Sequence, residues 1–219
     1  MTTFPGSPRL NKGGIVLMDP DTGLVLNIIP LQYNADTLTR TLQPQVSGGE
    51  SGDRVEALRL KGPPVETIKL DAEIDATDQL EFPDDNSTTI QHGIHPQLAT
   101  LEMFVYPTNT QIQSSNNLAA GGVLEVAPIE APLTLFIWSK HRILPVRLTE
   151  FSITEEAFDP SLNPIRAKIS MGMRVLSTND LQFTHRGSNL FMAHHQRKEF
   201  LSTLNQNGTL NILGIGGLL

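Results

Sequence analysis

The sequence has no cysteine among its 219 residues. Disulfides, cysteine-ligated zinc or iron–sulfur sites and thiol catalysis are therefore excluded, and a chain of this length can bury a core without such staples. Charged residues make up 18% and aromatic residues 5% of the chain, and the charged share is below the usual quarter. Asn, Gln, Ser and Thr supply the remaining polarity. This composition favours β structure and surfaces that contact other proteins.

Long apolar runs are also missing. Residues 1–14 lack the apolar core that a signal peptide needs. Two longer uncharged stretches, 103–124 and 200–219, each contain several Asn and Gln residues, whose amides would be unsatisfied inside a bilayer. We therefore expect a soluble protein that is cytoplasmic on synthesis and does not insert directly into a membrane.

The net charge of −7 arises in one part of the chain. Residues 47–85 contain 11 acidic and 4 basic side chains, whereas residues 139–219 carry a net charge of +3. A nucleic-acid-binding domain of this size is usually basic, so we expect no nucleic-acid partner. Two interpretations of the acidic region remain open. It is a solvated acidic face, or it is one side of a head-to-tail contact between copies, acidic face against basic face.

Alternating and β-branched runs predict strands over most of the chain. Residues 14–18 and 24–29 flank the turn sequence DPDTG and indicate a β-hairpin. Apolar residues at helical spacing predict helices at 94–105 and, after a Ser188 N-cap, at about 188–205. We also expect strands at 31–44 (in its second half), 65–74, 123–126, 133–139, 142–153 and 165–177. The strand at 142–153 is expected to bend near Pro145 and Glu150. Loops are expected at 82–92 and 108–122.

These elements predict a mainly β (β-rich α+β) fold. We expect an antiparallel sandwich or barrel with one packed helix, and a C-terminal helix followed by an apolar tail. Residues 1–187 are expected to form the β-rich domain, and residues 188–219 to form the C-terminal helix and a docking tail.

Residues 65–74 show the clearest period of two. Ile68, Leu70, Ala72 and Ile74 share one face of the predicted strand, and the opposite face is mostly acidic. An acidic strand face suits a basic partner, and the predicted strand at 165–177 carries basic side chains. The candidate interface residues are Asp71, Glu73, Asp75, Arg166 and Lys168, together with the C-terminal apolar residues Phe191, Phe200, Leu204, Ile212 and Ile215.

No motif in the sequence indicates catalysis. His92 and His95 have a spacing at which two imidazoles can share a metal, with Asp84 and Asp85 nearby, but they lie in a predicted loop and lack an HExxH context. The acids between residues 71 and 81 lack the glycine and glutamate positions of an EF-hand loop. P-loop and GxSxG patterns are absent. We therefore predict no catalytic, cofactor-binding or metal-binding residue, and no cofactor.

Three parts of the sequence together carry a family resemblance. They read QYNADTLTR (32–40), LRLKGPPVETI (58–68) followed by DATDQL (75–80), and FDPSLNPIRA (158–167). In combination they resemble the baseplate and tube adaptor protein of phage-tail-like contractile injection systems of the extracellular type. The resemblance extends over about residues 10–180. Relatives often have Asn-Pro where this chain has Asn34-Ala35, and many carry a C-terminal LysM module, for which the roughly 40 residues after Asp180 are too few.

The resemblance implies a non-enzymatic structural subunit. Six copies would form a ring that joins the inner tube and the spike hub to the baseplate of the assembled particle. The implied partners are the tube-initiator, spike or hub, and baseplate wedge proteins, and the segment 188–219 would dock where relatives use a LysM module. Two alternatives remain: a tail-tube protein proper, which stacks in many rings, and a stand-alone β-sandwich that binds carbohydrate or cell wall.

Overall fold

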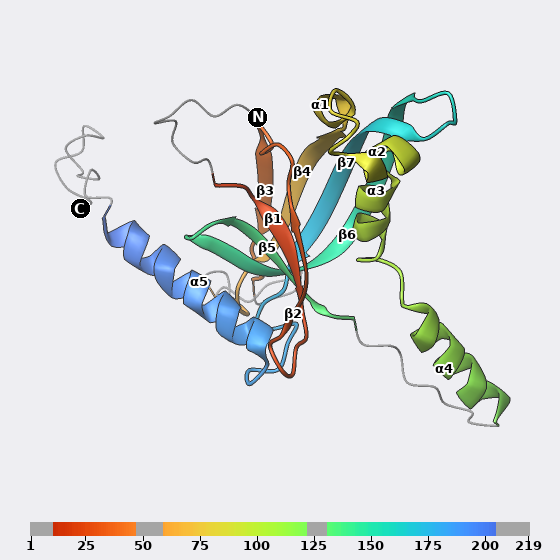
Figure 1. Cartoon of the computed structure of the whole chain (residues 1–219). Coiled ribbons are helices and arrows are strands. Elements are labelled where there is room, and N and C mark those ends of the chain that lie inside the picture. Colours follow the sequence, from red (N-terminus) through yellow and green to blue (C-terminus); the bar gives the residue numbers. More distant parts are fainter. Residues whose placement is uncertain (1–10, 47–58, 122–130, 205–219) are drawn as a thin grey trace.

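Seven strands form one antiparallel sheet in the order β2-β1-β5-β6-β7-β4-β3 (Figure 1). The computed structural model describes residues 11–46, 59–121 and 131–204. The strands are β1 (Gly14–Met18), β2 (Val25–Pro30), β3 (Leu38–Gln43), β4 (Val65–Asp75), β5 (Leu133–Ser139), β6 (Arg142–Phe158) and β7 (Pro164–Val175). The helices are α1 (Thr77–Leu80), α2 (Ser87–His92), α3 (His95–Glu102), α4 (Asn109–Ala120) and α5 (Arg186–Thr203). The mainly β fold predicted from the sequence is confirmed.

Strand β6 joins two halves of the sheet. Its first residues pair with β5, and from Val146 onward it pairs with β7. The register shifts between Leu148 and Glu150, where the sequence predicts a bend. The two halves therefore belong to a single sheet in the described residues, not to the two separate sheets of a sandwich, and β2 and β3 are its edges.

The hairpin β1–β2 follows directly from its turn sequence. The Asp19 carboxylate accepts hydrogen bonds from the backbone N–H groups of Thr22 (2.7 Å) and Asp21 (3.1 Å), and Gly23 has a φ of 75°. An Asx-type turn followed by a residue in the left-handed region is what DPDTG favours. The predicted hairpin is confirmed by the antiparallel pairing of β1 and β2.

The main core lies on one face of the sheet. The alternation in β4 buries Ile68 and Leu70, which face Met173 and Met171 of β7. Helix α3 adds Leu98 and Leu101 to this core, its N-cap residue Ile94 joins them, and α5 adds Phe191. On the opposite face of β1 and β5, a smaller cluster of Val16, Leu133 and Leu135 packs against Leu190 of α5.

Several local predictions are wrong. Residues 109–120 form helix α4 where a loop is expected, and residues 87–92 form α2 inside the other predicted loop. Ser188 is not the N-cap of α5: it is buried and donates a hydrogen bond to the carbonyl oxygen of Gln182 (2.8 Å), and His185 caps the helix through Gly187 N–H (3.0 Å). The strand expected at 123–126 lies outside the described residues.

Candidate assembly surface

Asp75, the last residue of β4, connects the three segments that carry the family resemblance. The Gln32 side chain donates to the Asp75 carbonyl oxygen (2.6 Å) and accepts from the Asp75 N–H (3.0 Å), as a neighbouring strand would. Arg166 of β7 donates to the Asp75 carboxylate (2.8 Å). The other carboxylate oxygen accepts the N–H of Thr77 (2.8 Å), which starts α1. These residues therefore hold strands together, and every polar group of Asp75 has a structural partner.

The ionisation of the Asp75–Arg166 pair follows from this geometry. Partial burial by itself would raise the pKa of Asp75, but hydrogen bonds from Thr77 and Arg166 outweigh it and lower that pKa. The same hydrogen bond to Asp75 raises the pKa of Arg166. The pair is thus charged on both sides at neutral pH, which strengthens the link between β4 and β7.

The outer face of β4, β7 and β6 brings the predicted acidic and basic interface residues together within one chain. In the register of β4 and β7, Glu73 lies opposite Lys168 and Asp75 opposite Arg166. Arg166 also lies 3.6 Å from Glu73, and Lys168 forms an ion pair with Glu156 of β6 (2.9 Å). The charge complementarity that the sequence suggests between copies is therefore partly satisfied inside the sheet.

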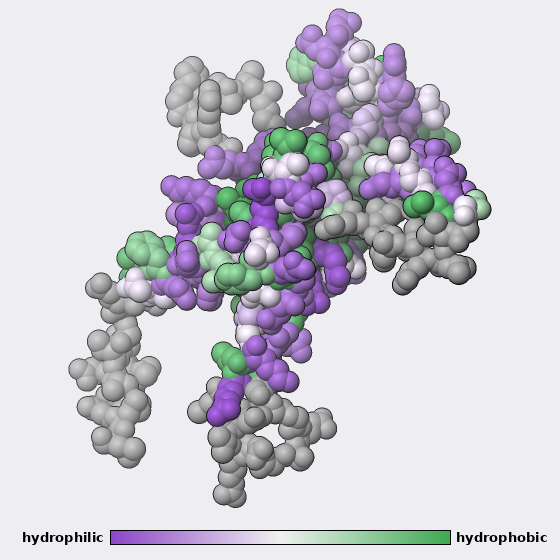
Figure 2. Space-filling model, turned by 90° about the horizontal axis from the view of Figure 1, so that it is seen from below, coloured by the Kyte–Doolittle hydropathy of each residue, from purple (hydrophilic) through white to green (hydrophobic). Residues whose placement is uncertain are grey.

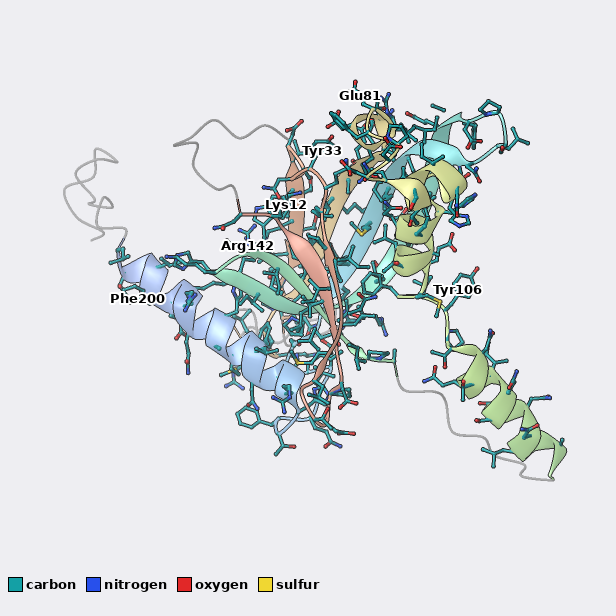
Figure 3. The ribbon with its side chains drawn as sticks, viewed as in Figure 1. Lys12, Tyr33, Glu81, Tyr106, Arg142 and Phe200 are labelled. Atoms are coloured by element: carbon teal, nitrogen blue, oxygen red, sulfur yellow. The ribbon has the colours of Figure 1, made fainter. Side chains whose placement is uncertain are left out.

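A hollow of about 420 Å³ lies between this face and the loop before β3, with both polar and apolar side chains in its lining. Tyr33 and Asp36 come from the loop, and Figure 3 places Tyr33 beside the upper end of β4. The sheet contributes carboxylates, hydroxyls and one ammonium group from Asp71, Glu73, Ser152, Thr154, Lys168 and Ser170. Asp71 is exposed here, and it forms no ion pair within the described ranges.

A buried ion cluster, which the sequence analysis missed, attaches α5 to the sheet. Glu66 of β4 is only 5% exposed, and its carboxylate binds Arg40 of β3 at 2.6 Å and Lys198 of α5 at 3.2 Å. Burial alone would raise the pKa of Glu66, but the charge of Lys198 and the hydrogen bond from Arg40 lower it overall. One signal was available: Glu66 is in phase with Ile68 and Leu70 on the apolar face of its strand.

His194 of α5 lies next to this cluster. Gly187, Phe191 and His194 form the buried face of α5 at helical spacing, and Lys198 continues the same stripe. Neither ring nitrogen of His194 has a hydrogen-bond partner in the described part of the chain. Burial lowers the pKa of His194, and the charge of Lys198 lowers it further. This imidazole is therefore neutral at pH 7.

The far end of α5 is exposed and apolar. Phe200 and Leu204 are 62% and 59% exposed, and hydrophobic side chains gather at this end of the molecule on the left of Figure 2. Phe191 does not share this property, because it is buried in the core of its own chain and is not available to a partner. Ile212 and Ile215 lie outside the described residues.

Helix α4 projects from the opposite side of the molecule (Figure 1). Thr108 and Gln111 form a capping box at its start, with the Thr108 N–H donating to the Gln111 side chain (2.9 Å). No residue of α4 is buried against the rest of the described chain, and Ile112 and Leu118 are exposed. A short helix without buried contacts is marginally stable in water, so packing against a partner surface would stabilise α4.

The described residues hold neither a candidate metal cluster nor a helix that could span a membrane. Within residues 11–46, 59–121 and 131–204, no three His, Asp or Glu side chains are grouped closely enough to hold a metal ion. His92 ends α2 and His95 begins α3. Of the helices described, none has the length and apolar character that crossing a membrane requires.

No family model matches the sequence, and no curated protein matches it either.

Proposed function

We propose that this chain is a non-enzymatic structural subunit of a contractile injection system. It would join the inner tube and the spike hub to the baseplate as part of a six-fold ring, with tube-initiator, hub and wedge proteins as neighbours. The observation that carries the proposal is the junction at Asp75, which links Gln32, Asp75 and Arg166, one residue from each segment of the family resemblance. The resemblance therefore concerns residues that act together in the fold.

The roles of these residues support a structural function. A catalytic carboxylate needs a free oxygen that can reach a substrate, whereas Asp75 is engaged by Thr77 and Arg166. The aspartate in the third segment of the resemblance, residues 158–167, is also engaged by neighbouring backbone groups. Asp159 accepts the N–H groups of Ser161 (2.7 Å) and Asn163 (2.8 Å) and closes the turn between β6 and β7.

The surfaces suit a subunit with several neighbours. One broad face presents alternating acids and bases, and α4 and the end of α5 extend in different directions from the sheet (Figure 1). Mixed charges on a broad face give orientation and partner choice rather than raw affinity. Extended arms with exposed apolar side chains provide the anchors that such contacts need.

Assembly of the particle tests the proposal. We expect Asp71→Lys combined with Glu73→Lys to leave the fold intact and to block particle assembly, as seen by electron microscopy of the purified native assembly. Asp75 is left unchanged because it holds Arg166. The matched control, Asp84→Lys with Asp85→Lys, makes the same charge change in the exposed segment before α2. Normal particles from the first variant, or a native assembly that lacks this chain, would overturn the proposal.

The hollow beside Tyr33 favours one second candidate, a carbohydrate-binding module. A concave site that combines an aromatic ring with a few carboxylates and hydroxyls suits a small polar ligand such as a sugar, and Tyr33 is partly exposed. A glycan or cell-wall pull-down with the purified protein separates this candidate from the first. Binding that is lost in Tyr33→Ala, without a change in assembly, would favour the carbohydrate-binding function.

A further inference from the structure

A mostly apolar groove lies between the β1–β2 hairpin and the segment that joins α3 to α4. It has a volume of about 550 Å³. Its apolar lining residues are Leu17, Leu26, Met103, Phe104, Val105, Tyr106, Ala131 and Pro132. Among the described residues, no charged side chain lines it. An adjoining hollow of about 430 Å³ shares Phe104, Val105, Ala131 and Pro132, so the apolar surface continues beyond the groove.

The side chains in this groove are exposed to an unusual degree. Leu26, Val105 and Tyr106 are 56%, 50% and 63% exposed within the described part of the chain. Contiguous apolar surface of this kind on a protein usually marks a contact site. Because the described lining carries no charge, a charged segment would lose its hydration against these residues without compensation. The occupant is therefore expected to be uncharged and apolar.

One segment of this chain has these properties. Residues 205–219, NQNGTLNILGIGGLL, contain six Leu or Ile residues and no charged residue. They continue directly from the exposed end of α5, where Phe200, Leu201 and Leu204 already form an apolar surface. The end of α5 and residues 205–219 together make an uncharged apolar arm.

The positions of the arm and the groove favour a contact between copies. Figure 3 shows Phe200 near the far end of α5 and Tyr106, which lines the groove, on opposite sides of the molecule. Helix α5 carries the chain away from the groove (Figure 1). Residues 205–219, which span at most about 50 Å when fully extended, would have to turn back past α5 and cross the molecule to reach the groove of their own chain, whereas a neighbouring copy can present its groove directly.

We infer that residues 205–219 of one copy bind the groove of the next copy. This deepens the proposed function, on which it rests, by naming the partner of the C-terminal arm as a second copy of the chain. The contact is head-to-tail, because the arm and the groove are different surfaces. Repetition of such a contact closes into a ring when its rotation allows closure.

Trans-complementation of two defective variants tests the inference. Leu26→Glu places a charge in the groove and keeps the arm, whereas deletion of residues 205–219 removes the arm and keeps the groove. Each variant alone is expected to be monomeric by sedimentation velocity at concentrations where the wild-type chain associates. An equimolar mixture should form a 1:1 heterodimer, because it contains one intact arm and one intact groove. Leu24→Glu is the matched control, because Leu24 is 66% exposed on the same hairpin but does not line the groove.

A binding measurement gives the affinity of residues 205–219 for the groove. Residues 205–219 fused to an unrelated soluble carrier should bind the deletion variant, and Leu26→Glu in that variant should weaken binding at least tenfold, which corresponds to about 1.4 kcal/mol. Leu24→Glu should change binding less than threefold. Circular dichroism and thermal melting of each variant establish that it is folded.

Three outcomes would overturn the inference. A deletion variant that loses much of its thermal stability shows that the arm packs on its own chain. A mixture that stays monomeric shows the same, or that another segment such as 122–130 fills the groove. A deletion variant that associates like the wild type shows that copies meet elsewhere. Because these measurements use the purified chain alone, the proposed place in an injection particle is tested separately by microscopy.

Discussion

Glu66 of β4 and Lys198 of α5 form an ion pair at 3.2 Å, although 132 positions separate them in the sequence. The same carboxylate binds Arg40 of the edge strand β3. Burial and the nearby charge of Arg40 lower the pKa of Arg142, and the charge of Glu66 partly offsets this effect. Two cations therefore pair with one buried anion, and this cluster ties α5 to the sheet.

Removal of the anion should destabilise the fold. In Glu66→Gln, Arg40 and Lys198 lose a buried counter-charge, and we expect the free energy of unfolding to fall by about 3 kcal/mol. Urea denaturation at pH 7 measures this change. The control is Glu150→Gln, because the Glu150–Lys69 pair is about two-thirds exposed on both sides, and such pairs contribute under about 1 kcal/mol. Equal losses in the two variants would contradict a special role for the cluster.

Stability should decrease in two stages as the pH falls. The pKa of His194 is lowered by burial and by Lys198, so the unfolded state takes up the proton first and stability begins to fall below about pH 6.5. The pKa of Glu66 is lowered overall, because its cationic partners outweigh the opposing effect of burial. Its contribution is complete above about pH 4.3, the unfolded value, and is lost as the pH falls further through the folded value.

Denaturant titrations at a series of pH values separate these two stages. His194→Leu should abolish the decrease that begins near pH 6.5 and should keep the decrease at lower pH. A variant that retains the full pH dependence of the wild type would show that His194 does not cause the first stage.

Gly93 should tolerate no side chain. It follows α2 with a φ of 57°, and a Cβ atom there would overlap the carbonyl oxygen of Pro164, which accepts the N–H of Ile94 (2.9 Å). We expect Gly93→Ala to lower the free energy of unfolding by about 2 kcal/mol or more. Thermal melting provides the measurement. Gly121→Ala is the control, because Gly121 has a φ of −75° and its Cβ would meet no atom closer than 3.4 Å; a melting temperature as low as that of Gly93→Ala would refute the explanation.

The capping box of α4 should control that helix alone. Thr108→Ala removes the acceptor for the Gln111 N–H (3.3 Å), and loss of such a cap costs about 1 kcal/mol. Amide hydrogen exchange in residues 109–120 of the monomeric chain should accelerate about fivefold, with no change in melting temperature because no α4 residue is buried. Thr110→Ala, in the same helical turn, should leave exchange unchanged. A lower melting temperature would mean that α4 belongs to the cooperative core.

The elements that depend on local patterns could be predicted from the sequence. The β1–β2 hairpin follows from DPDTG, and the buried face of β4 follows from its period of two. Helix α4 was missed because its residues lack an apolar period, although the Thr108–Gln111 capping box was a local signal that was available. Serine is a residue type favoured at helix N-caps, but tertiary packing buries Ser188.

The sequence by itself determined which side chains share a strand face, because alternation is a property of a single extended chain. It placed Asp71 and Glu73 on one exposed face of β4 and apolar residues on the other. Only the tertiary structure decided which strands are neighbours. The adjacency of β4 and β7 sets Asp75 beside Arg166 across 91 residues, and the packing of α5 sets Lys198 beside Glu66. Sheet order and helix docking arise from the burial of distant apolar surfaces against each other, and no local pattern encodes that choice.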